Sequence, residues 1–496
     1  MKRTLSLILA LLMLLSAFLA VACAEDTGTT EESDTKAEGS ETVAETEAET
    51  QRSDVSDNLP ENTYDGADFN ILTYYKNESW FKMTEEEAED VLDESIYKRN
   101  DKVEQRFDIK LTYKGAGDSF EYWDCSQAMQ QSIASDEDIY DAYINHVIQT
   151  GIDTANFYFQ DMTKADYIDF DQPWWCAVTE DLSYNGVVLF AIGSYDMTAL
   201  GNTYGIAYNK GIGADYGVTD DLIELVNNKT WTVEKMNSYI KDVYYDFNGD
   251  SQKDADDIYG LVLTGRGTSE DSWFFSLGGK NCEIEKDGTI TTTFMSEWVT
   301  DFVQWFYDLT WDAPYCYTDF ETWNLGSKRF VLGKTMFAET TFNLYSQYKE
   351  VSGLDYMLLP YPMWTEEEGR YYSCVDAGHT AQAIPITVKD TEYSSIILEA
   401  LNAESWKLVV PAFYDITLKT KTAGDDTEAE MIDLIANCRV YDFGYYYGQW
   451  CPPHYAITDA IKAKDTNFVS IYESNYKSKW LDVVEIIGNT FDEYTK

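Results

Sequence analysis

The strongest constraint on the fold is a regular alternation of short apolar strands and amphipathic helices that begins near residue 66. Strands are predicted at FNILTYY (69–75), IKLTYKG (109–115) and YDAYINH (140–146). Between consecutive strands, apolar residues recur at helical spacing over 92–107 and 122–133. Because strands that alternate with helices usually pair in parallel beneath those helices, this order predicts the α/β fold class.

The same patterns continue along the chain. Further strands are predicted at VVLFAIGSYD (187–196), TYGIAYNK (203–210), TMFAETT (335–341), YMLLPYP (356–362) and AQAIPIT (381–387). Thr232 is predicted to cap a helix that follows it, and the C-terminal third reads as mainly helical. A chain of 496 residues exceeds the size at which one hydrophobic core stops growing, so we expect two lobes.

Composition excludes several classes of function. The 88 acidic and 36 basic residues give a net charge of −52, which repels phosphate backbones and argues against a nucleic-acid partner. No HExxH or GxSxG motif occurs, and the three histidines are scattered. The sequence therefore favours an acid-rich secreted protein without a recognisable catalytic motif.

The N-terminus has the features of a bacterial lipoprotein signal. A basic Lys2–Arg3 pair precedes the apolar stretch Leu5–Ala20, which is too short to span a bilayer comfortably. The following sequence LAVAC resembles a lipobox, which predicts acylation of Cys23, although its AVA also fits ordinary signal-peptidase cleavage. Residues 1–23 are thus predicted to be a signal peptide ending in an anchor cysteine.

Residues 24–65 are rich in Glu, Thr, Ser and Ala and have almost nothing to bury, which predicts a disordered acidic tether. Anchor and tether together place the folded part at the extracellular face of a cell membrane, attached to it only by lipid.

The other cysteines show no metal-binding or disulfide pattern. None belongs to a CxxC pair, and their number is odd, so buried thiols with at most one unassigned bridge are expected. They are Cys125, Cys176, Cys282, Cys316, Cys374, Cys438 and Cys451.

An acidic segment, DFNGDSQKDADD (246–257), has the spacing of an EF-hand-like calcium loop. The oxygen ligands predicted for Ca²⁺ are Asp246, Asn248, Asp250, Gln252 through its backbone carbonyl, Asp254 and Asp257. Ser251 stands where such loops usually have glycine, and the last ligand is Asp where Glu is usual. Because no second loop accompanies it, the expected role of the calcium ion is structural.

Aromatic residues are abundant, with 38 tyrosines and 14 tryptophans, and several lie in predicted loops, as in PWW (173–175) and YYYGQW (445–450). An aromatic face can stack on the C–H face of a pyranose ring, while Asp, Asn and Gln bond its hydroxyl groups. This composition favours a sugar ligand.

The chain resembles the extracellular solute-binding lipoproteins of carbohydrate ABC transporters across nearly all of residues 66–440. The motifs that carry the resemblance are IYKRNDKVEQRFDIKL (96–111), PWW (173–175), GIAYNK (205–210), NKTWTVEKM (228–236), DFNGDSQKDADDIYGL (246–261), FVLGKTMFAE (330–339), MLLPYPMW (357–364) and AIPITVKDTEYSSIILEAL (383–401).

This resemblance implies the two-lobed type II periplasmic-binding-protein fold, with hinge crossovers near residue 200, near 376–380 and near 440. Lobe 1 would comprise 66–200 and 378–440, and lobe 2 would comprise 201–377 and 441–496. The implied protein is a non-enzymatic monomer that closes on a carbohydrate and presents it to the permease subunits of the transporter.

Ligands of such open α/β sheets meet the loops at the carboxyl ends of the strands. By that rule and by their aromatic character, the predicted ligand-binding residues are Asn145, His146, Trp174, Trp175, Ser194, Asp196, Glu339, Thr341, Asp376 and Trp450.

Two other functions stay open on the sequence. A secreted glycoside hydrolase would use similar aromatic residues together with a fixed pair of carboxylates. A surface adhesion module could be built around the calcium loop.

Overall fold

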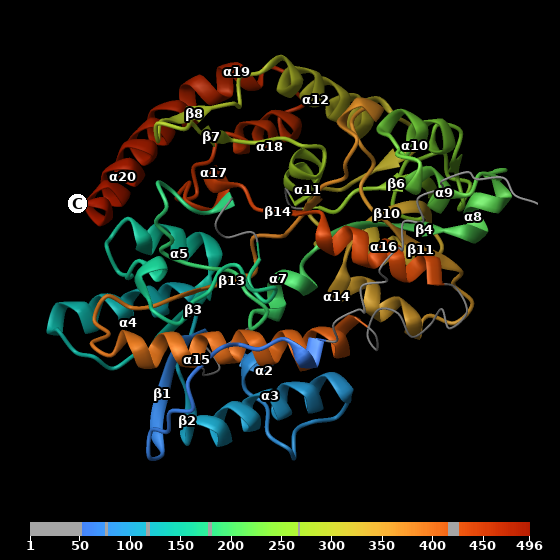
Figure 1. Ribbon diagram of the computed structural model, residues 1–496. Coiled ribbons are helices and arrows are strands. Elements are labelled where there is room, and N and C mark those ends of the chain that lie inside the picture. Colours follow the sequence, from blue (N-terminus) through green and yellow to red (C-terminus); the bar gives the residue numbers. More distant parts are fainter. Residues whose placement is uncertain (1–51, 75–77, 116–119, 177–180, 266–267, 415–425) are drawn as a thin grey trace, which may run out of the picture. The chain divides into compact units, whose positions relative to one another are not determined.

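The computed structural model describes residues 52–74, 78–115, 120–176, 181–265, 268–414 and 426–496 (Figure 1). The predicted signal peptide, Cys23 and residues 24–51 of the predicted tether lie outside the described residues. None of the helices in the described segments combines the length and the apolar character that crossing a bilayer requires.

The first sheet has the strand order β13-β3-β1-β2. Its strands are β1 (Ala67–Thr73), β2 (Ile109–Lys114), β3 (Ala142–His146) and β13 (Thr380–Ala383). β1 pairs in parallel with both β2 and β3, whereas β13 joins β3 antiparallel. The helices α3 (Val91–Phe107) and α4 (Tyr122–Ser135) connect the parallel strands, which confirms the predicted βαβαβ unit.

The second sheet has the order β11-β4-β10-β6-β5, with β9 beside β6. Its strands are β4 (Tyr204–Asn209), β5 (Tyr244–Tyr245), β6 (Ile258–Val262), β9 (Cys316–Tyr317), β10 (Thr335–Thr341) and β11 (Tyr356–Leu359). β10 and β9 are parallel to β6, but β4 runs antiparallel to both β10 and β11. The α/β class is confirmed, and this sheet is mixed.

Several helices accompany the second sheet. Those that pack directly on its strands are α8 (Lys210–Asp215), α10 (Val233–Ile240), α13 (Leu325–Phe330) and α14 (Phe342–Tyr345). The same part of the chain includes α9 (Leu222–Asn227), α11 (Thr268–Ser276) and α12 (Glu297–Tyr307). Thr232 caps α10 as predicted, because its Oγ1 accepts a hydrogen bond from the backbone N–H of Lys235 at 3.2 Å.

The predicted strand at 187–196 is wrong. Most of this apolar segment is buried, yet it forms only isolated bridges: Val187 with Tyr184, Ala191 with Gln382 and Gly193 with Trp175. It ends where Asp196 caps the short helix α7 (Met197–Gly201). A run of apolar residues indicates that a segment is buried but not that it is a strand. This segment is packed on both sides and does not pair along its length with a strand of either sheet.

Three crossover segments between the sheets lie side by side, near the predicted residues 200, 376–380 and 440. β12 (Ser373–Cys374) pairs in parallel with β14 (Arg439–Val440). Thr203 bridges Val375, and the N–H of Asp376 donates to the carbonyl of Asn202 at 3.0 Å. We call this meeting place the junction.

Helices contributed by the C-terminal part complete the fold. They are α15 (Thr391–Glu404), α16 (Asp426–Asn437), α17 (Phe443–Tyr446), α18 (Tyr455–Lys462), α19 (Phe468–Ile471) and α20 (Lys477–Thr495). α15 packs beside α3 of the first sheet (Figure 1). α16 packs against β11 and α9 of the second sheet, although its residues were predicted to belong to lobe 1.

The predicted tether ends earlier than residue 65. Residues 52–65 contact α3, which covers the first sheet. Asp57 forms an ion pair of 2.5 Å with Arg106, and the N–H of Tyr64 donates to the carbonyl of Phe107 at 2.9 Å. Leu59 joins the core. The segment is mostly polar and acidic, so its composition gave no indication of these few packing contacts.

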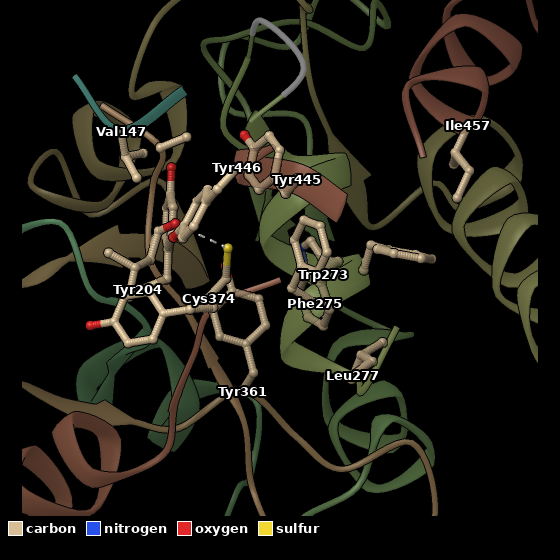
Figure 2. Packing of buried hydrophobic residues seen from close by; sticks show 14 of the residues in the cluster. Val147, Tyr204, Trp273, Phe275, Leu277, Tyr361, Cys374, Tyr445, Tyr446 and Ile457 are labelled. Carbon is tan, nitrogen blue, oxygen red and sulfur yellow. Dashed lines mark hydrogen bonds between the residues drawn. The ribbon is translucent and has the colours of Figure 1, made fainter. Parts of the chain in front are cut away.

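The largest buried cluster reaches from the second sheet to the junction. Figure 2 shows Trp273, Tyr361, Cys374 and Tyr445 among its members. The seven cysteines of the described segments are all free, and four of them are buried, so no disulfide joins them.

Candidate ligand-binding site

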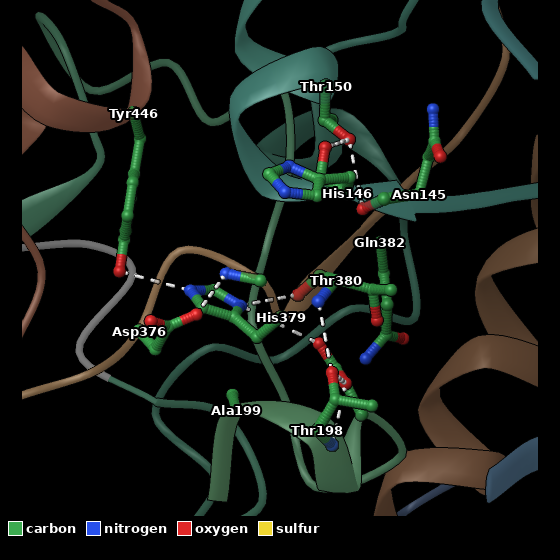
Figure 3. A network of polar contacts seen from close by, with 12 residues as sticks. Asn145, His146, Thr150, Thr198, Ala199, Asp376, His379, Thr380, Gln382 and Tyr446 are labelled. Carbon is green, nitrogen blue, oxygen red and sulfur yellow. Dashed lines mark hydrogen bonds and ion pairs between the residues drawn. The ribbon is translucent and has the colours of Figure 1, made fainter. Parts of the chain in front are cut away.

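A buried histidine ties the crossover segments together at the junction. Nδ1 of His379 lies 2.8 Å from the carbonyl oxygen of Thr380, and Nε2 lies 3.0 Å from the hydroxyl of Tyr446 (Figure 3). Because a carbonyl only accepts, Nδ1 carries the proton and Nε2 accepts from the tyrosine. The carbonyl of His379 in turn accepts from the N–H of Val147, at the start of α5 (Val147–Thr154). His379 thus links β13 and α17 through its side chain, and the carboxyl end of β3 through its backbone carbonyl.

Two carboxylates belong to the same region. Asp376 accepts from the N–H of Gly378 at 2.8 Å and from the hydroxyl of Tyr204 at 3.2 Å. Asp271 accepts from the hydroxyl of Tyr445 at 2.8 Å. Burial, with the negative charge of Asp271 added to it, raises the pKa of Asp376.

Asp271 also has a histidine partner. Its Oδ1 lies 3.3 Å from Nε2 of His454, and its side chain is 16% exposed. Asp376 is also only partly buried, beside the exposed Gly378. Asp376 can therefore be reached from solvent, and Oδ1 of Asp271, which accepts no hydrogen bond from the described residues, keeps capacity for a ligand's hydroxyl group.

An aromatic cluster stands at the carboxyl end of β3. We define the junction aromatic cluster as Tyr122, Trp123, His146 and Trp450. The ring of Tyr122 lies 4.7 Å from that of Trp123 and 4.9 Å from that of His146, which lies 5.6 Å from Trp450. Trp123 is 47% exposed and Trp450 41% exposed, so aromatic faces remain open to solvent.

The backbone at Trp450 is held in a rare conformation. Its φ is +59°, a value that bulky residues seldom adopt, and Gln449 before it has φ +50°. This left-handed pair follows α17 and directs the indole toward His146 and Tyr122. The turn is what brings a C-terminal tryptophan to the first sheet.

The structure brings three of the predicted ligand-binding residues to the junction, namely His146, Asp376 and Trp450. Asn145 lies beneath them, fully buried, where its Nδ2 donates to the carbonyl of Tyr122 at 2.9 Å and to the hydroxyl of Tyr143 at 2.6 Å. Its place there is to support the cluster.

A second group of predicted residues makes no contact with the junction aromatic cluster that the structure records. Trp174 and Trp175 are buried, and their indole N–H groups donate to the two carboxylate oxygens of Glu399 at 2.8 and 2.9 Å. Burial raises the pKa of Glu399 to about 8 in spite of these donors. Ser194 and Asp196 line a cavity next to Trp175.

The third group is buried in the second sheet. Glu339 is fully buried and accepts from the N–H of Thr264, the hydroxyl of Ser269 and the indole of Trp273. Burial raises its pKa to about 7. Thr341, the last residue of β10, pairs in register with Tyr204. This group holds β10 against α11.

Sequence reasoning missed Tyr122, Trp123, Asp271, Tyr445 and His454 at this site. Tyr122 and Trp123 open the helix after β2, and Asp271 lies in the first turn of the helix after β6. These positions follow the carboxyl ends of strands, so the same positional rule could have found them.

The acidic loop has one feature expected of an EF-hand-like turn. Ser251 has φ +60°, the left-handed conformation that glycine usually supplies at this position. Asp246 accepts from the N–H groups of Gly249 and Ser251, and the buried Asp257 accepts from that of Phe247. Within the described residues, no three acidic, histidine or cysteine side chains are gathered closely enough to hold a metal ion. The backbone turn fits calcium, whereas the carboxylates are engaged with amides.

No protein-family model matches the sequence, and no curated protein is significantly similar to it. Solved structures match 86% of the chain. A cyclo/maltodextrin-binding protein complexed with maltotetraose is 11% identical, with a TM-score of 0.53 over 97% of its own length. The substrate-binding protein Lmo0181 from Listeria monocytogenes, in complex with cycloalternan, is 12% identical, with a TM-score of 0.52 over all of its length. Maltose-bound MalE3 of T. maritima is 13% identical, with a TM-score of 0.51 over 98%. The chain therefore has the two-lobed fold of ABC-transporter substrate-binding proteins.

Proposed function

We propose that the chain is a lipid-anchored, extracellular substrate-binding protein of an ABC importer. It binds a sugar or an oligosaccharide at the junction and delivers it unchanged to the permease. It acts as a monomer and is not an enzyme. Calcium in the acidic loop serves the stability of the fold.

The observation that carries this proposal is the meeting of open aromatic faces and accessible carboxylates where the crossovers converge. Trp123 and Trp450 offer apolar platforms, while Asp271 and Asp376 offer acceptors. A sugar needs both, because its ring has an apolar face and a rim of hydroxyl donors. A ligand held at crossovers also favours closure of the lobes, the form that a transporter would select. Solved proteins of the same fold hold maltose, maltotetraose or cycloalternan.

Calorimetric titration with maltose, maltotetraose and cycloalternan tests the proposal. The variant Trp450→Ala is expected to weaken binding about tenfold, because an aromatic contact contributes about 0.5–1.5 kcal/mol beyond its buried area and about 1.4 kcal/mol is tenfold in affinity. Tyr245→Ala removes another exposed aromatic ring, 54% exposed on β5, and should leave affinity unchanged. Equal loss in both variants, or no binding of any sugar, would contradict the proposed site.

The non-enzymatic part and the anchor have separate tests. Chromatography after long incubation with maltotetraose should show only intact sugar, and any shorter product would point to the hydrolase alternative. Cys23→Ala should move the protein from the membrane fraction to the medium. Retention of that variant in the membrane would contradict lipid anchoring through this residue.

A further inference from the structure

A cavity of about 290 Å³ lies against the crossovers, and none of the junction aromatic cluster lines it. Its walls come from residues 173–176, 193–200, 406–414 and 436–441, together with Arg52. Trp175 belongs to the core of the first sheet, whereas Ala436 belongs to α16, which packs on the second sheet. The hinge cavity, as we name it, is thus enclosed by both sides of the hinge.

One wall carries a buried carboxylate with an unused acceptor. Asp196 is 2% exposed, and its Oδ1 accepts from the N–H and the hydroxyl of Thr198. Its Oδ2 makes no hydrogen bond to any part of the chain that the structure describes. His379 Nδ1 lies 3.9 Å away and donates instead to the carbonyl of Thr380. A buried acceptor without a donor is costly, so this oxygen suits a ligand that donates.

The same cavity also contains two guanidinium groups. Nη1 of Arg52 donates to the carbonyl of Trp406 at 3.1 Å, and this guanidinium lies 5.0 Å from the Trp406 ring. Nε of Arg439 donates to the carbonyl of Ala436 at 2.9 Å. The planar fork of an arginine can donate two parallel hydrogen bonds to a carboxylate or a phosphate. The cavity therefore offers both a negative and a positive partner.

We infer that the hinge cavity binds a small zwitterion that carries an ammonium group and a carboxylate, such as a free amino acid. The ammonium would donate to Asp196, and the carboxylate would pair with Arg439. The volume lies at the lower end of ligand sites, which span about 300–1,000 Å³, and is too small for an oligosaccharide. Because both lobes contribute walls, occupancy alters the free energy of lobe closure and so the sugar affinity, a coupling that rests on the proposed function.

Calorimetry and thermal melting of the full chain with L-serine test the inference. Ethanolamine, which carries only the ammonium group, and propionate, which carries only the carboxylate, serve as the two halves of L-serine. L-serine should bind and raise the melting temperature, and each half should bind at least about tenfold more weakly, because it lacks one of the two charged groups that hydrogen-bond to the cavity. Asp196→Asn and Arg439→Gln should each weaken L-serine by a similar factor. If Asp196→Asn fails to fold because Asp196 caps α7, then Arg439→Gln and the two half molecules test the hinge site.

The variant Trp450→Ala separates this inference from the proposed function, because it should lose sugar affinity and keep the L-serine response. Absence of L-serine binding at millimolar concentration, binding of either half as tight as that of L-serine, or unchanged binding in folded Arg439→Gln would each overturn the hinge site. Binding of L-serine without any sugar binding would uphold the hinge site and overturn the junction site instead.

Discussion

The bond network around Glu399 predicts an unusual dependence of stability on pH. Burial raises the pKa of this carboxyl from 4.5 to about 8, while the indoles of Trp174 and Trp175 donate to its two oxygens. A raised folded-state pKa means that the folded protein holds a proton that the unfolded chain releases. The stability linked to this group is therefore full below pH 4.5 and is lost as pH rises to about 8.

The size of the effect follows from the shift. At about 1.36 kcal/mol per pKa unit, a rise from 4.5 to about 8 corresponds to a loss of about 5 kcal/mol across that pH range. Glu399→Gln removes the titration. It also leaves one indole N–H facing an amide N–H₂, at a cost of about 1–3 kcal/mol that does not depend on pH. The variant should thus be less stable than wild type at pH 5, and the difference should shrink or reverse by pH 8.5.

Urea unfolding of the full chain and of the variant, at half-unit steps from pH 5 to 8.5, measures how this difference in stability changes with pH. Glu392→Gln is the matched control, because it removes an exposed carboxylate from the same helix, α15, and should run parallel to wild type. If Glu399→Gln also ran parallel to wild type across the whole range, the carboxyl would titrate normally, and the reasoning from burial would be refuted.

Three further predictions concern stability. Thr232→Ala removes the cap of α10 and should lower the free energy of unfolding by about 1 kcal/mol in urea titrations, whereas Thr232→Ser should restore most of it. Burial pushes the pKa of Asp57 up, but the hydrogen bonds from Arg106 and from the backbone N–H of Leu59, together with the positive charges of Arg106 and Lys407, outweigh it and lower this pKa below 3.8. Arg106→Leu should therefore lower the free energy of unfolding by about 1–3 kcal/mol at pH 7, and by less as the pH falls through the lowered pKa of Asp57 and the aspartate becomes protonated; a cost that does not change with pH would contradict the ion pair. EDTA should lower the melting temperature if the acidic loop holds calcium, because an ion present at about a hundred times its dissociation constant adds about 2.7 kcal/mol to the free energy of unfolding. If neither EDTA nor the substitution Asp250→Asn changed the melting temperature, the loop would hold no stabilising calcium ion and would be a solvated turn.

Much of the fold could be predicted because local periodicity encodes which face of a segment is buried. The strands β1, β2, β3, β4, β10, β11 and β13, the helix α3 and the Thr232 cap all follow from patterns within about 20 residues. The same logic failed at 187–196, where the apolar run is buried on both sides as an irregular segment. Periodicity does not distinguish a strand from a buried connection.

The sequence by itself determined the α/β class and the presence of a carbohydrate-type residue composition. Only the tertiary structure decided which aromatic and acidic residues meet. It placed Trp450 beside His146, engaged Trp174 and Trp175 with Glu399, and buried Glu339 in the second sheet. The physical reason is that a strand's face is set by its own alternation, whereas a site is set by contacts between segments up to about 300 residues apart. Those contacts depend on the packing of the whole chain, which no single motif records.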